Sequence, residues 1–124
     1  MPSASRLSGL SILVLEDNFI LADEITRALE DAGATVIGPF PRDADAIEAL
    51  ANRRPDCALL DINLGAGPSF AAAEAARERG IPLVLTTGYD ETTLPRHLAD
   101  AVLLRKPVHH DQLARAVAQV CRPA

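Results

Sequence analysis

Three acidic residues stand directly after apolar runs, at positions where their carboxylates can take part in chemistry. Glu16 and Asp17 follow the run Ile12–Leu15. Asp61 follows the run Cys57–Leu60. Each acid alone has an ordinary explanation as a helix cap or a loop residue. If the fold brings all three into one crevice, however, their charges repel one another unless a cation neutralises them.

These carboxylates predict a site for a hard divalent cation. Oxygen ligands with open positions for water suit Mg²⁺ or Mn²⁺ better than zinc. The turn Asp61–Leu64 can supply one more oxygen, and the backbone carbonyl of Asn63 is the best candidate within it. The predicted metal ligands are therefore Glu16, Asp17, Asp61 and the carbonyl of Asn63.

A threonine and a lysine follow two later apolar runs. Thr87 comes after Leu83–Leu85 and before Gly88, which lets a ligand approach the backbone closely. Lys106 follows Ala101–Leu104 and is the one lysine among twelve basic residues. Each residue alone has an ordinary explanation: threonine is common at strand ends, and a single lysine among arginines can reflect codon bias. Together with the acids they favour phosphoryl transfer to a carboxylate, because a lysine is a compact point charge that suits phosphate oxygens.

The elements that must position these residues are five short strands alternating with helices. The strands are predicted from runs that are continuously apolar, as in parallel sheets buried on both faces. The runs are Ile12–Leu15, Thr35–Ile37, Cys57–Leu60, Leu83–Leu85 and Ala101–Leu104. Helical periodicity between them predicts a (βα)5 chain, an α/β doubly wound parallel sheet of flavodoxin-like strand order 2-1-3-4-5. In such sheets ligands bind at the carboxyl ends of the strands.

Capping residues, proline and glycine predict where the helices begin and end. Asp43 is expected to cap a helix that ends before Pro55, and Asp111 to cap the last helix. An alanine-rich helix is expected over Phe70–Arg79. The connector Asp90–Asp100 has a weak pattern and leaves room for only a short helix.

A known protein family carries the same residues at the ends of its strands. These residues are Glu16, Asp17, Asp61, Thr87 and Lys106-Pro107. The constellation resembles the receiver domain of bacterial two-component response regulators, and the resemblance covers nearly the whole chain. The stretch that ends in Thr87-Gly88-Tyr89 is similar to stand-alone, single-domain receivers of alphaproteobacteria with a Thr-Gly-Tyr motif.

The resemblance implies a role for each of these residues. Asp61 would be the phosphoacceptor, and Glu16 and Asp17 the metal-binding acids. Thr87 and Lys106 would contact the phosphoryl group. The resemblance also implies one receiver domain over residues 1–124 and a cis peptide bond between Lys106 and Pro107.

The residues that would sense phosphorylation depart from the common receiver pattern. Receivers usually carry an aromatic residue three positions before the lysine, and this chain has Leu103 there. The chain's one tyrosine, Tyr89, lies two residues after Thr87. One interpretation is that both residues merely pack. The other, which we favour, is a switch in which Thr87 moves, Tyr89 reorients and the segment Asp90–Asp100 changes order.

Composition bounds the class of protein. With 124 residues, 48% of them hydrophobic, the chain is expected to form one globular domain. A net charge of −5 argues against a nucleic-acid partner. The sequence has neither the run of about 20 apolar residues that a membrane span needs nor a secretory signal. Two cysteines, Cys57 and Cys121, fit no disulfide framework. We therefore expect a cytoplasmic protein with no membrane partner.

The function predicted from these observations is that of a single-domain response regulator, not an enzyme. It would accept a phosphoryl group from a sensor histidine kinase or phosphotransfer protein and signal by protein–protein interaction, or drain phosphoryl groups from a shared kinase. A start at Met1-Pro2 favours a complete chain, but a receiver fragment of a hybrid kinase remains an alternative. A pseudo-receiver that only binds partners is another. A flavin or nucleotide carrier is disfavoured, because Glu16-Asp17 would repel a phosphate.

Overall fold

The computed structural model describes residues 6–64, 67–88 and 94–121. Its centre is a parallel sheet of five strands in the order β2-β1-β3-β6-β7. The strands are β1 (Ser11–Leu15), β2 (Thr35–Phe40), β3 (Cys57–Asp61), β6 (Leu83–Thr87) and β7 (Val102–Arg105). A two-stranded antiparallel hairpin, β4 (Asn63–Leu64) and β5 (Gly67–Pro68), lies outside this sheet. The predicted doubly wound fold and the order 2-1-3-4-5 are confirmed, with the five sheet strands counted along the chain.

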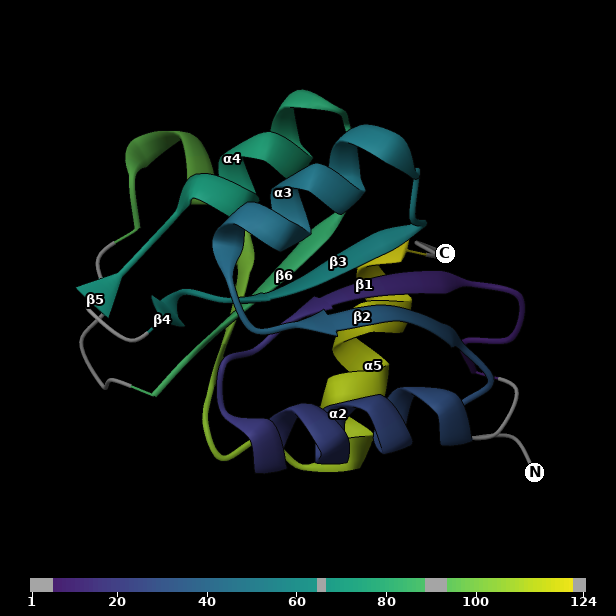
Figure 1. Ribbon diagram of the computed structural model, residues 1–124. Coiled ribbons are helices and arrows are strands. Elements are labelled where there is room, and N and C mark those ends of the chain that lie inside the picture. The colour runs from purple at the N-terminus through teal and green to yellow at the C-terminus, as the bar shows by residue number, and fades with distance from the viewer. Residues whose placement is uncertain (1–5, 65–66, 89–93, 122–124) are drawn as a thin grey trace.

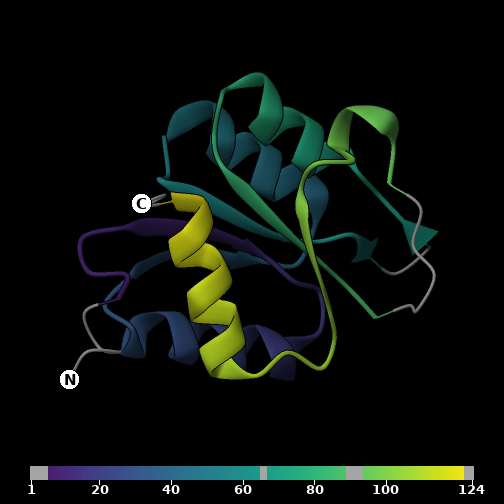
Figure 2. The same ribbon diagram turned by 180° about the vertical axis from the view of Figure 1, so that it is seen from behind.

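Helices cover both faces of the sheet. The described helices are α2 (Phe19–Asp31), α3 (Asp43–Asn52), α4 (Ala71–Glu78), α5 (His110–Cys121) and the 3₁₀ helix η1 (Arg96–Leu98). Figures 1 and 2 show α2 and α5 on one face and α3 and α4 on the other. Each face has its own apolar core, one including Leu29 and Val117 and the other Leu50 and Leu60. No helix in the described part of the chain is long and apolar enough to cross a membrane.

The central strands are continuous apolar runs because helices bury them on both sides. All five residues of β3 and all five of β6 are buried. The edge strands β2 and β7 each have one buried position, Ile37 and Leu104, among exposed and half-buried ones. A strand buried on both faces has no solvent side on which polar residues would be favoured. The central strands could therefore be predicted from the sequence alone.

Two helix starts differ from the predictions. Arg42 occupies the N-cap position of α3 without a side-chain capping hydrogen bond. Asp43 lies inside the first turn, where its Oδ2 accepts a hydrogen bond of 2.5 Å from Ser69 Oγ. Helix α5 begins at His110, so Asp111 also lies in a first turn. A carboxylate is favourable anywhere in a first turn because it faces the positive end of the helix dipole, and the sequence does not distinguish these neighbouring positions.

Strand β2 is longer than its apolar run. It continues through Gly38 and Pro39 to Phe40, with a register irregularity against β1 and a positive φ of 105° at Gly38. A Gly-Pro pair normally marks the end of a strand, so the sequence predicted an earlier end. The extension has a consequence for the site, because the Phe40 carbonyl accepts a hydrogen bond of 2.9 Å from the Glu16 amide.

Candidate functional site

The predicted acidic residues lie together at the carboxyl edge of the sheet. Strands β1 and β3 are neighbours in register, with Leu15 opposite Leu60, so the residues that follow them meet. Glu16, Asp17 and Asp61 each offer one carboxylate oxygen, and these three oxygens lie within 4.8 Å of one another. Glu16 and Asp61 are buried, whereas Asp17 is exposed. A set of hard oxygen donors at this spacing, open to solvent on one side, fits a divalent cation such as Mg²⁺.

Lys106 links the two buried acids. Its Nζ lies 2.7 Å from Glu16 Oε1 and 2.9 Å from Asp61 Oδ2. The lysine follows β7, and its amide donates a hydrogen bond of 2.8 Å to the Thr87 carbonyl at the end of β6. One ammonium against three carboxylates leaves two negative charges, which a divalent cation would balance. The predicted cis peptide bond between Lys106 and Pro107 is confirmed.

Burial and charge shift the pKa values of this pair. Burial raises the pKa of Glu16, and the negative charge of Asp61 adds to the rise, while the Lys106 ammonium and the Asn18 amide oppose it. The net direction for Glu16 is upward. Burial lowers the pKa of Lys106, but its contacts with Glu16 and Asp61 outweigh that effect and the pKa is raised. The lysine is therefore a permanent cation at neutral pH.

The backbone of the first loop is held by its own side chains. The Asn18 side chain accepts a hydrogen bond of 3.0 Å from the Leu21 amide and caps α2. The Asn18 amide donates to Glu16 Oε2 at 3.0 Å. Asn18 is thus the N-cap of α2, and Asp17 is exposed beside the other two acids.

The turn after β3 contains a contact that the sequence did not predict. The Asn63 amide donates to Asp61 Oδ1 at 2.9 Å. Its side-chain oxygen, Oδ1, accepts the Thr87 hydroxyl at 2.5 Å and the Gly88 amide at 3.0 Å. From the sequence, only the backbone carbonyl of Asn63 was expected in the site. No sequence signal points to the side chain, because its partners lie 24 and 25 residues away.

The structure describes two of the three predicted switch residues, Thr87 and Leu103. Leu103 lies on β7 opposite Leu85 and packs, partly buried, against the core beneath α3 and α4. Tyr89 falls outside the described residues, as does most of the first half of the connector Asp90–Asp100. The connector's described half contains η1, anchored by the fully buried Leu98. The proposed switch stays a prediction.

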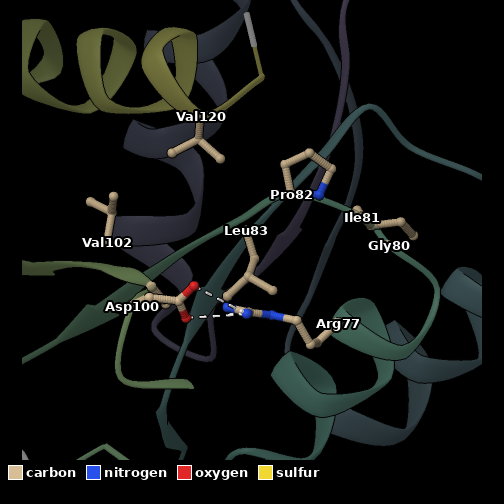
Figure 3. Close-up of a pocket in the computed structure, with 9 residues that line it drawn as sticks. Arg77, Gly80, Ile81, Pro82, Leu83, Asp100, Val102 and Val120 are labelled. Atoms are coloured by element: carbon tan, nitrogen blue, oxygen red, sulfur yellow. Dashed lines mark hydrogen bonds and ion pairs between the residues drawn. The ribbon is translucent and has the colours of Figure 1, made fainter. Parts of the chain in front are cut away.

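Two cavities open at opposite ends of the sheet. One of about 340 Å³ lies beside the acidic cluster and is lined by Asp17, Pro41, Arg42, Asp43 and Leu64. The other, of about 300 Å³, opens at the amino ends of β6 and β7. Figure 3 shows its lining, in which the Arg77–Asp100 ion pair of 3.1 Å lies among Leu83, Val102 and Val120. The first cavity borders Asp17, the exposed acid of the cluster, whereas the lining of the second includes none of the three acids.

Comparison with known proteins identifies a family and several related chains. A family model described as the response regulator receiver domain matches residues 12–118. The sensory transduction protein LytT of Bacillus cereus is 30% identical over 112 residues, which are 87% of this chain and 46% of LytT. The phyllosphere-induced regulator PhyR of Methylorubrum extorquens is 28% identical over 112 residues, 87% of this chain and 42% of PhyR. The chain therefore spans about half the length of the curated relatives it matches.

A solved structure resembles the fold over nearly its whole length. The solution structure of SdrG from Sphingomonas melonis Fr1 superposes with a TM-score of 0.78 at 32% sequence identity. The match covers 94% of this chain and 98% of the SdrG chain. The similarity to the alphaproteobacterial Thr-Gly-Tyr subtype and the domain limits 1–124 stay predictions.

Proposed function

Because this chain belongs to the response regulator receiver domain family, in which phosphorylation and Mg²⁺ are typical, we propose that it accepts a phosphoryl group on Asp61. The donor would be a sensor histidine kinase or a phosphotransfer protein. One observation carries the proposal. Asp61 is 2% exposed, and Lys106 contacts its Oδ2 while the Asn63 amide contacts its Oδ1, beside two further carboxylates.

The chemistry is a nucleophilic substitution at phosphorus. A carboxylate oxygen of Asp61 attacks the phosphorus of a phosphohistidine, the bond from phosphorus to the ring nitrogen breaks, and an acyl phosphate forms. The transition state is loose, so positioning and charge stabilisation supply most of the catalysis. Mg²⁺ held by Glu16, Asp17, Asp61 and the Asn63 carbonyl would offset the negative charge of the acids and of the phosphoryl group.

Two side chains of the site supply the other contacts. Lys106 has its ammonium against Asp61, from which it can neutralise a phosphoryl oxygen. Thr87 is buried at the end of β6, and its hydroxyl can donate a hydrogen bond to another phosphoryl oxygen. Water would hydrolyse the acyl phosphate and reset the protein. On this proposal no external metabolite is turned over, and the protein is not an enzyme.

A protein partner is supported by the surface beside the site. Phe19 and Ile20 are 86% and 65% exposed at the start of α2, two and three residues after Asp17. Large apolar side chains next to a polar site are typical of protein interaction surfaces. A kinase or phosphotransfer protein that presents its phosphohistidine to Asp61 would cover them.

Two forms of the whole protein are consistent with the comparisons. The SdrG match, which covers nearly all of that solved chain, supports a single-domain regulator that signals by protein–protein interaction or drains phosphoryl groups from a shared kinase. The partial coverage of LytT and PhyR supports the alternative of a receiver fragment, as in a hybrid kinase. Phosphotransfer from a panel of candidate kinases would identify the donor.

Intact mass measurement tests the assignment of Asp61. Wild-type protein incubated with a small-molecule phosphodonor and Mg²⁺ should gain the mass of one phosphoryl group, and Asp61→Asn should gain none. The matched control is Asp23→Asn, an exposed aspartate on α2 that pairs with Arg27 and should behave like wild type. A full gain in Asp61→Asn would refute the site. No gain in wild type would favour a pseudo-receiver.

A further inference from the structure

The Asn63 side chain accepts hydrogen bonds from two donors beside the proposed phosphoacceptor. Its Oδ1 accepts both the Thr87 hydroxyl at 2.5 Å and the Gly88 amide at 3.0 Å. The backbone amide of Asn63 donates a hydrogen bond to Asp61 at the same time, so both the backbone and the side chain of this residue belong to the site. The proposed function gives the Thr87 hydroxyl to a phosphoryl oxygen. The same donor therefore has two acceptors, one present before phosphorylation and one after it.

The orientation of the Asn63 side-chain carboxamide follows from its hydrogen-bond partners. A backbone amide can only donate, so the atom that faces the Gly88 amide must be the side-chain oxygen. The other end, Nδ2, is then buried and has no hydrogen-bond partner among the described residues. A buried donor without an acceptor costs free energy, so the side chain is well bonded at one end and unsatisfied at the other.

We propose that the Asn63 side chain is a built-in competitor of the phosphoryl group: its Oδ1 holds the Thr87 hydroxyl and the Gly88 amide before phosphorylation and gives up both when a phosphoryl oxygen arrives on Asp61. The proposal rests on the proposed function. We call this set of contacts the Asn63 clasp, defined by Asn63, Thr87 and Gly88.

Relative bond strength sets the direction of the exchange. The Asn63 oxygen is neutral, whereas phosphoryl oxygens are charged, and charge-assisted hydrogen bonds are roughly twice as strong as neutral ones. Departure of the side chain also lets the buried Nδ2 reach water. The phosphoryl oxygen is therefore the stronger acceptor for the two donors, but the hydrogen bonds of the clasp must break before it can bind them. Removing the Asn63 acceptor should then make the site easier to occupy.

Beryllofluoride, a non-covalent mimic of the phosphoryl group, gives the test in the presence of Mg²⁺. Its affinity is measured on the full chain by titration calorimetry, and the Gly88 amide is followed by ¹H–¹⁵N NMR. Asn63→Ala should bind the mimic about fivefold more tightly than wild type, the effect of losing one ordinary hydrogen bond from the competing state. Before any mimic is added, its Gly88 amide proton should shift upfield.

Further variants separate the clasp from a structural role. Asn63→Leu keeps the side-chain volume without the acceptor and should also bind more tightly, which covers the case in which one variant fails to fold. In a Thr87→Val background the gain from Asn63→Ala should shrink, because one of the two contested donors is gone. Asn52→Ala, which removes an exposed amide bonded to Glu48 on α3, is the control and should match wild type.

Each outcome decides the proposal. Equal or weaker binding by folded Asn63→Ala and Asn63→Leu would overturn the clasp and would leave the proposed function intact, since a merely structural residue lowers affinity when it is removed. A wild-type protein that binds no mimic at all would refute the proposed function and the clasp with it.

Discussion

Replacing Lys106 by methionine should strongly destabilise the metal-free protein. The side chains of Glu16 and Asp61 are 0% and 1% exposed, and Lys106, itself 19% exposed, is the cation that contacts both. Removing one partner of a buried ion pair costs about 3–5 kcal/mol, because the remaining charge is left uncompensated. Since Lys106 keeps some contact with water, we expect the lower end, a loss of about 3 kcal/mol in the free energy of unfolding.

The pH dependence of this loss is the sharper test. Burial already raises the pKa of Glu16, and without Lys106 nothing from the lysine opposes that rise. A raised pKa in the folded state means that the folded protein binds a proton more readily than the unfolded chain, so stability increases as pH falls through it. The penalty of Lys106→Met should therefore be largest near neutral pH and smaller under mildly acidic conditions, where Glu16 becomes neutral.

Urea unfolding followed by circular dichroism, in EDTA, measures the penalty at both pH values. The control is Arg115→Met, which breaks an ion pair of 3.3 Å with Asp111 whose side chains are 63% and 68% exposed. An exposed pair contributes about 1 kcal/mol or less, so this variant should stay near wild type at either pH. A Lys106→Met penalty as small as the control's, or one that does not change with pH, would refute the reasoning.

Three further predictions concern the metal, the backbone and the switch. Asp17→Ala should abolish the rise in unfolding midpoint that Mg²⁺ gives wild type by mass action, and an unchanged Mg²⁺ response would exclude Asp17 as a ligand. Gly38→Ala should cost about 2 kcal/mol or more in urea unfolding, because φ is 105° and the new methyl would lie 2.8 Å from a backbone nitrogen. Gly88→Ala, whose methyl meets no atom of the described residues within 4 Å, should cost far less. Amide exchange over residues 94–101 should change when beryllofluoride binds, and identical protection would rule out the predicted switch.

The sequence alone was sufficient for the fold and for the place of the charged residues. Continuous apolar runs revealed the strands because both faces of the sheet are covered. The handedness of the crossovers then leaves few strand orders, so the residues after β1, β3 and β7 had to converge. Glu16, Asp61 and Lys106 could be placed in one site by this rule, and the structure brings them within hydrogen-bond range.

Only the tertiary structure decided the finer contacts of the site. The Asn63 side chain on β4 meets Thr87 and Gly88 at the end of β6, and the longer β2 brings the Phe40 carbonyl to the Glu16 amide. The antiparallel pair of β4 and β5 and the first residues of α3 and α5 were likewise not predicted. Periodicity reports which face of an element is buried. It carries no information on side-chain rotamers or on distances between residues far apart in the chain, and those quantities determine which donor meets which acceptor.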